Sequence, residues 1–151
     1  TELDVVLGKL AGSLGFLSAA LLLTLVYPVM LVVLGNPDPG PIIGGYMGTL
    51  LVGTAYLSIG LLVSSWTQSQ VAAFLASVAI CAAFTFMDRI PEALGIHAVQ
   101  ALSVLSFSQH FRSIARGVID SRDIVFFLGI ICAAVAWTVY SLESRKWKKG
   151  G

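Results

Sequence analysis

The side chains of this chain that could do chemistry gather in one segment, residues 88–123. It contains His97, His110, Asp120 and Asp123, which are residue types that bind metals or transfer protons. The histidines have no third ligand at the spacing of a zinc site, and the acids have no recognisable spacing to a nucleophile. The pattern therefore predicts no catalytic, cofactor-binding or metal-binding residue, and an intramembrane enzyme is the least supported alternative.

Three charged residues of this segment recur every four positions, namely Arg112, Arg116 and Asp120. In a helix this spacing places them on one face, where opposite charges stabilise the helix slightly. A second face would be apolar, and it is formed by Val104, Phe107, Phe111, Ile114 and Val118. Two interpretations of the charged face stay open: a solvated surface, or an extracytoplasmic gate that contacts substrate.

The elements that must position these side chains are four apolar runs without Asp, Glu, Lys, Arg or His. They are residues 14–34, 42–65, 71–87 and 124–142. A helix needs roughly 20 apolar residues to cross a bilayer. With 57% hydrophobic and 11% charged residues, and a mean hydropathy of +0.90, the chain has too few polar side chains for a soluble domain. We therefore predict an all-α integral membrane protein with four transmembrane helices.

The remaining segments complete a single transmembrane domain over residues 1–151. Residues 1–11 have the pattern of a cytoplasmic amphipathic helix, and Pro28 predicts a kink near Thr24. Residues 35–41 and 64–70 are rich in turn-forming or polar side chains, so they connect antiparallel helices. Residues 88–123 hold too few consecutive apolar residues to span, and we expect an extracytoplasmic re-entrant or interfacial helical hairpin there.

Two glycines one helical turn apart, Gly44 and Gly48, would let another helix approach closely. Glycine is common in membrane helices, so the motif alone does not identify the neighbour. A tight contact within the chain and a seam between two copies are both open at this point, and the first is favoured.

Orientation follows from the basic tail, residues 143–151, which contains Arg145, Lys146, Lys148 and Lys149. The positive-inside rule places this tail in the cytoplasm. Four spans then place the other terminus there too, in a multi-pass protein of the inner (cytoplasmic) membrane. The arginines of residues 88–123 would lie outside, which runs against the rule.

Composition also excludes several classes of function. A net charge of +1 gives no basis for nucleic-acid binding. The chain has no GxxxxGK[ST] loop, so any ATP must be bound by a partner. The four apolar runs contain no ionisable carboxylate, amine or imidazole, which argues against a transporter driven by protons or sodium.

Several short motifs resemble the permease subunit of a type 2 ATP-binding-cassette transporter, of the gliding-motility and copper-processing (nitrous-oxide-reductase maturation) type. They appear in the same order along essentially all of the chain. They are Glu2 with Leu7, Gly8 and Lys9; residues 35–38; residues 64–70; residues 102–106; His110 with Phe111; residues 116–123; and residues 142–145.

The resemblance implies six transmembrane helices, of which this chain would hold the last four, so it is expected to be N-terminally incomplete. It implies that residues 1–9 end a coupling helix, with Glu2, Asp4 and Lys9 at the ATPase interface. It places Arg112, Arg116 and Asp120 at the outer gate or substrate contact. ATP and magnesium would be bound by separate ATPase subunits, so this chain itself would be no enzyme and hold no cofactor.

The function expected from this resemblance is the substrate pathway of an ATP-driven exporter. Its partners would be ABC ATPase subunits, a second permease copy or paralogue, and membrane lipid. The alternative is a non-transporting membrane scaffold or assembly factor whose hairpin binds an extracytoplasmic partner. ATP-stimulated movement of a substrate across reconstituted vesicles distinguishes the two.

Overall fold

The computed structural model describes residues 1–89 and 104–149, and for residues 145–149 it describes the backbone alone. Within these ranges the protein is all-helical. The helices are α1 (Glu2–Leu23), α2 (Val26–Leu34), α3 (Pro39–Trp66), α4 (Gln70–Phe86), α7 (Phe107–Ala115) and α8 (Ser121–Lys149).

Three helical stretches are long and apolar enough to cross a membrane, which makes this a membrane protein. They are α1 with α2 (Glu2–Leu34), α3, and the part of α8 from Ser121 to Ser144. The fourth predicted span corresponds to α4, an apolar helix of 17 residues. The helices follow the four apolar runs closely, because a helix satisfies all of its own backbone hydrogen bonds in lipid.

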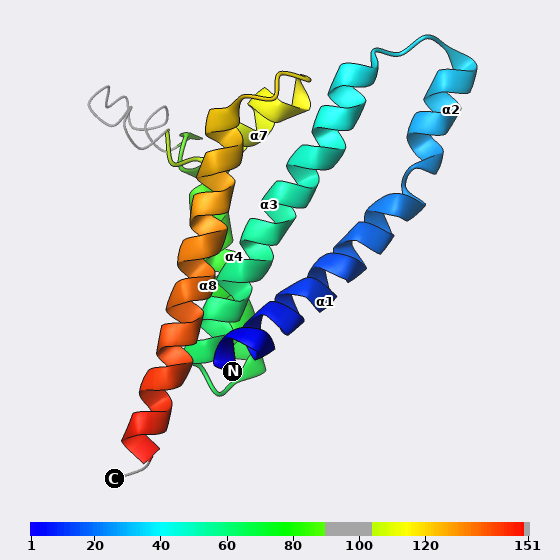
Figure 1. Cartoon of the computed structure of the whole chain (residues 1–151). Helices are drawn as coiled ribbons and strands as arrows, with labels where there is room; N and C mark the ends of the chain where they lie inside the picture. The colour runs from blue at the N-terminus through cyan, green and yellow to red at the C-terminus, as the bar shows by residue number, and fades with distance from the viewer. Residues whose placement is uncertain (90–103, 150–151) are drawn as a thin grey trace.

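The helices form a bundle with both termini at one end (Figure 1). α3 lies at its centre and contacts α1, α4, α7 and α8. The α2–α3 loop and α7 lie at the opposite end, and α1 moves away from α3 on its way there (Figure 1). The buried core is correspondingly on α3, where Ala55, Ile59 and Val63 pack with apolar side chains of α7 and α8.

The starts of α3 and α4 follow from their capping residues. The Asp38 side chain accepts a hydrogen bond from the Gly40 backbone N–H at 3.0 Å, and a proline opens the helix. The Ser69 hydroxyl accepts a longer one, 3.5 Å, from the Ala72 backbone N–H. Both caps lie in segments that the sequence predicts to be turns.

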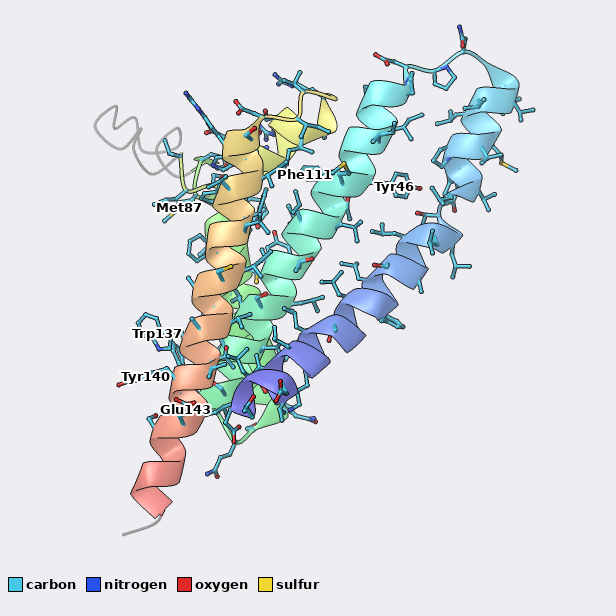
Figure 2. All side chains as sticks on the ribbon, viewed as in Figure 1. Tyr46, Met87, Phe111, Trp137, Tyr140 and Glu143 are labelled. Carbon is cyan, nitrogen blue, oxygen red and sulfur yellow. The ribbon has the colours of Figure 1, made fainter. Side chains whose placement is uncertain are left out.

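The predicted kink in the first span is confirmed. α1 ends at Leu23 and α2 begins at Val26, and the axis of α2 departs from that of α1 at this break (Figure 1). Pro28 has no N–H for the carbonyl of Thr24, which is the bond that a straight helix would need. The Thr24 carbonyl instead accepts a hydrogen bond from the Tyr27 backbone N–H at 3.0 Å. The Thr24 hydroxyl shares a 2.9 Å hydrogen bond with Tyr46 of α3, which is labelled in Figure 2. α1 is continuous from Glu2, so residues 1–11 form its first turns and no separate helix.

Residues 104–123 differ from the helix that the four-residue spacing predicts. α7 ends at Ala115, and Gly117 turns the chain with a φ of 83°, a value that favours glycine. Asp120 therefore lies beyond α7 and cannot share a helical face with Arg112 and Arg116. Val104 and Val118 are exposed and stand outside α7 as well. The first part of the predicted hairpin, with His97, lies outside the described residues.

Candidate functional site

α7 is held at the end of the bundle by a close approach to the glycines of α3. A Cβ atom on Gly44 would stand 2.0 Å from the Ile114 carbonyl oxygen, and one on Gly48 would stand 3.1 Å from the Phe111 ring. Both glycines are buried. The tight contact within the chain, favoured by the sequence, is thus confirmed, and its partner is the short helix α7.

A single aromatic side chain anchors the start of α7 in the core. Phe107 is 1% exposed, and its ring stacks on Tyr56 of α3 and Phe84 of α4, with centroid distances of 5.6 and 5.3 Å. The edges of Phe126 and Phe127 of α8 complete the cluster. One ring therefore touches three of the long helices, so the position of α7 is fixed by aromatic packing.

A polar cleft of ≈ 570 Å³ opens between α7 and the start of α8. It is lined by Gln109, His110, Arg112, Ser113, Arg116, Val118 and Asp123. The structure thus brings together two of the three residues predicted for the outer gate, Arg112 and Arg116, and both are exposed. Asp120 is not part of the lining. Its carboxylate accepts a hydrogen bond from the Arg122 backbone N–H at 3.0 Å, at the start of α8.

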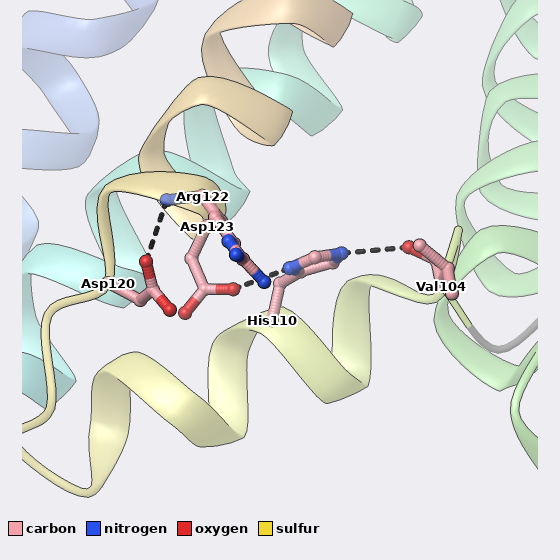
Figure 3. A network of polar contacts seen from close by, with 5 residues as sticks. All are labelled: Val104, His110, Asp120, Arg122 and Asp123. Atoms are coloured by element: carbon pink, nitrogen blue, oxygen red, sulfur yellow. Dashed lines mark hydrogen bonds and ion pairs between the residues drawn. The ribbon is translucent and has the colours of Figure 1, made fainter.

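His110 and Asp123 form a pair in the lining of this cleft, with Asp123 buried and His110 partly buried (Figure 3). His110 Nδ1 lies 2.6 Å from Asp123 Oδ1, and Nε2 lies 2.8 Å from the Val104 carbonyl oxygen. The imidazole also stacks on Phe126 at 4.0 Å. Each ring nitrogen thus has an oxygen partner, and the two contacts together fix the orientation of the ring.

Sequence reasoning treats His110 and Asp123 as isolated side chains and misses this pair. They are 13 positions apart and belong to different helices, with the Gly117 turn between them. Asp123 is 6% exposed, and in the described part of the chain its Oδ2 has no hydrogen-bond partner. A buried carboxylate oxygen without a partner is energetically unfavourable, which sets Asp123 apart from the other described side chains.

An apolar groove of ≈ 780 Å³ runs between α1, α3 and α4. A second cavity of ≈ 330 Å³ continues it toward α7, and the two share Leu17, Gly53, Tyr56 and Thr85. None of the described residues that line either of them is charged. The sequence alone offers no signal for this groove, because its lining side chains are ordinary for membrane helices.

Three of the hydroxyl groups that line the groove, those of Tyr56, Ser77 and Thr85, form hydrogen bonds within the protein. Tyr56 and Thr85 hydrogen-bond to each other across α3 and α4, and Thr85 also donates to the Cys81 carbonyl at 2.7 Å. Ser77 donates to the Ala73 carbonyl of its own helix. The groove therefore offers mainly apolar contact, and it can accommodate an apolar or amphipathic group without an ion pair.

The residues expected at the ATPase interface lie at the other end of the molecule. Glu2, Asp4 and Lys9 occupy the first turns of α1, where Asp4 and Lys9 are exposed and Glu2 is partly exposed. This is the end that carries both termini, opposite to α7 (Figure 1). The structure therefore keeps the two predicted sets of site residues at opposite ends of the bundle.

The same end carries aromatic side chains typical of a membrane interface. Trp66 at the end of α3 meets Trp137 of α8 edge to face, with the centroids 6.5 Å apart. Tyr140 is exposed one turn further along α8 (Figure 2). Indole and phenol rings at the end of apolar helices favour the headgroup level.

Among the residues that the structure describes, no group of three His, Cys, Asp or Glu side chains is arranged to hold a metal ion. No protein-family model matches this chain, and neither a curated protein nor a solved structure matches it. The functional assignment consequently depends on the groove, the cleft and the sequence motifs.

Proposed function

We propose that this chain is the membrane-spanning part of a permease subunit of an ATP-driven transporter, of the type 2 ATP-binding-cassette class, located in the inner membrane. The observation that carries the proposal is the uncharged groove between α1, α3 and α4. A transport subunit needs a route between its membrane helices, and a route without charged groups argues against coupling to a proton or sodium gradient. The resemblance then implies that a partner's ATP drives transport.

The course of the chain supports four membrane crossings. Both termini lie at one end of the bundle (Figure 1), so a membrane around it is crossed an even number of times. Three stretches are long enough to cross, and α4 would then be the fourth. At 1.5 Å per residue α4 extends about 25 Å, against a hydrocarbon core of about 30 Å. Local thinning of the bilayer accommodates such a mismatch.

The place of α7 also supports this class of transporter. The resemblance implies a short re-entrant element on the outer side, directly before the last transmembrane helix. α7 precedes α8, lies at the end opposite the termini, and enters the core through Phe107. With the basic tail and both termini in the cytoplasm, α7 and its arginines would face outward.

In this proposal the conformational change starts at the end of the bundle that carries both termini. ATPase subunits would bind ATP and magnesium and press on the start of α1, near Glu2, Asp4 and Lys9. α1 is continuous from these residues into the wall of the groove. A push on its first turns would therefore shift the groove as a rigid-body change. A second permease copy or paralogue would close the open side of the groove.

Co-purification tests the proposal. The protein is co-expressed with the products of neighbouring genes, and it is isolated through a tag in mild detergent. We expect a soluble subunit with a Walker-type ATPase to co-purify, and Glu2→Lys with Asp4→Lys to reduce its recovery. Arg112→Gln serves as the control, since it lies at the far end. Recovery without any ATPase would contradict the proposal.

The scaffold alternative keeps one observation in its favour, the pair of exposed arginines in the outer cleft. Such a scaffold would recruit an extracytoplasmic protein through Arg112 and Arg116, with no need for ATP. Recovery of extracytoplasmic partners alone, lost on Arg112→Gln, would establish that function in place of transport.

A further inference from the structure

The cleft between α7 and α8 has a cationic side and an acidic side. Arg112 lies in the last turn of α7 and Arg116 caps the helix one turn later, with Gln109 and Ser113 beside them as neutral donors. Asp123 provides the acid from the first turn of α8. The remaining charged groups nearby belong to Asp120 and Arg122, and the carboxylate of Asp120 is engaged by the Arg122 backbone N–H. The cleft therefore fits a ligand with charges of both signs.

The cationic side fits a phosphate group. A guanidinium presents paired N–H donors that match two oxygens of one phosphate, and two arginines a turn apart can bind the same group. Both side chains are exposed, so they reach a ligand without rearrangement of α7. A cleft of ≈ 570 Å³ is within the size range of small-molecule sites.

The acidic side fits a primary amine. Asp123 Oδ1 is engaged by His110, whereas Oδ2 has no partner among the described residues. Asp123 lines the cleft, and Oδ2 lies just under its surface. An ammonium group offers three N–H donors and a positive charge, which together satisfy such an oxygen. A quaternary amine has no N–H and would not.

The surroundings identify the ligand as a lipid. Val104, Leu105, Val118 and Ile119 are exposed beside the cleft, and Val118 is part of its lining. α7 and the start of α8 lie at the end of the bundle opposite the termini, where a membrane around the helices would have its headgroups. A ligand in the cleft thus has its charged part on Arg112, Arg116 and Asp123 and its apolar part on the flanking side chains.

We propose that the cleft binds the headgroup of an aminophospholipid, with the phosphate on Arg112 and Arg116 and the primary amine on Asp123. This site is independent of the transport proposal, because it requires neither the groove nor an ATPase. A bound lipid would fasten α7 to α8 at the position where the two helices meet.

Native mass spectrometry of the full chain in detergent tests this site. The chain is titrated with phosphatidylethanolamine, phosphatidylcholine or phosphatidylglycerol of identical acyl chains. We expect phosphatidylethanolamine to bind about tenfold more tightly than the other two, since each of them lacks the primary amine. Soluble glycerophosphoethanolamine, measured in the same way, distinguishes a lipid site from a site for the free headgroup.

Variants assign the contacts. Arg112→Gln and Arg116→Gln should each weaken phosphatidylethanolamine binding about tenfold, because each removes a charge-assisted hydrogen bond. Arg122→Gln removes the same charge from α8 outside the cleft lining and should leave binding unchanged. Asp123→Asn keeps an acceptor for His110 and should abolish the preference for phosphatidylethanolamine over phosphatidylcholine while phosphate binding remains.

Three results would overturn the inference. Equal binding of the three lipids by the unmodified chain would remove the role of Asp123. Equal effects of Arg112→Gln and Arg122→Gln would remove the phosphate site. Binding of glycerophosphoethanolamine as tight as that of the lipid would show that the membrane surface plays no part.

Discussion

The helix α7 and the stretch formed by α1 and α2 both pack against α3, but they differ in how much of their apolar surface is buried within the chain. α7 has nine residues, and it buries Phe107 and Ile114 almost completely. The Glu2–Leu34 stretch is far longer and more apolar, yet none of its most hydrophobic window is buried within the chain. From hydropathy alone, the Glu2–Leu34 stretch would be expected to be the more deeply buried of the two.

The difference shows what each apolar surface contacts. In lipid, helices associate through close packing and hydrogen bonds, since apolar surface gains little from burial there. α7 meets this requirement with a ring cluster and a glycine contact, and α1–α2 does so near Val6 and Leu10, at the Thr24–Tyr46 hydrogen bond and where Leu17 meets Gly53. The other side chains of α1–α2 mostly line the groove or are exposed.

Truncation of the central ring should have the largest effect on stability. Phe107→Ala removes the ring that joins α3, α4 and α8, and we expect it to destabilise the protein by about 4 kcal/mol. Phe16→Ala removes the same ring from α1, where it is 80% exposed, and should change stability by less than about 0.5 kcal/mol. Thermal unfolding in detergent measures both, and similar losses would refute the comparison.

Disruption of the glycine contact between α3 and α7 should have the second largest effect on stability. Gly44→Ala places a Cβ where the Ile114 carbonyl oxygen stands, which should cost about 2 kcal/mol and shift α7. Gly45→Ala is the matched control on the next residue, where a Cβ has no atom within 4 Å. We expect it to be neutral or slightly stabilising, because alanine favours a helix. Reversed effects in thermal unfolding would mean that α7 does not pack on this face.

Loss of the His110–Asp123 pair between α7 and α8 should destabilise the protein slightly less. His110→Phe retains a ring on Phe126 but leaves both oxygens of Asp123 unpaired, at a cost of about 1.5 kcal/mol. Removing the acid as well, in His110→Phe with Asp123→Leu, should recover part of that loss. A double variant no more stable than the single one in chemical denaturation would contradict the pairing.

Loss of the hydrogen bond between α3 and the α1–α2 stretch should have the smallest effect on stability. Tyr46→Phe removes the hydrogen bond to Thr24 and should cost about 1 kcal/mol. Tyr140→Phe, at an exposed ring on α8, is the matched control and should be silent. If the two variants unfold at the same temperature, the kink is not held by Tyr46.

The sequence predicts the long elements well and the short ones poorly, for physical reasons. Runs without charge, Pro28, and the turns at residues 35–41 and 64–70 act locally, so their consequences appear where the sequence places them. The extent of α7 depends on Gly117 and on packing against α3, neither of which a four-residue spacing reveals. The four-residue spacing therefore places Asp120 on α7, although this helix ends at Ala115.

The contacts of the candidate site also differ in whether the sequence predicts them. Arg112 is in the last turn of α7 and Arg116 caps that helix, so their four-residue spacing places them together. The pair of His110 with Asp123, and the groove around Tyr56 and Thr85, form between different helices. Such contacts depend on how the bundle packs, and no local pattern in the sequence encodes them.

The central proposal, that ATP on a partner rearranges the groove, is tested most directly by the two cysteines. Cys81 lines the groove, whereas Cys132 is exposed on α8 outside it. Single-cysteine versions, Cys132→Ala and Cys81→Ala, are reconstituted with the ATPase and labelled with a membrane-permeant maleimide. We predict that ATP with magnesium changes the labelling rate of Cys81 and leaves that of Cys132 constant. An unchanged rate at Cys81, in a complex that hydrolyses ATP, would contradict the proposal.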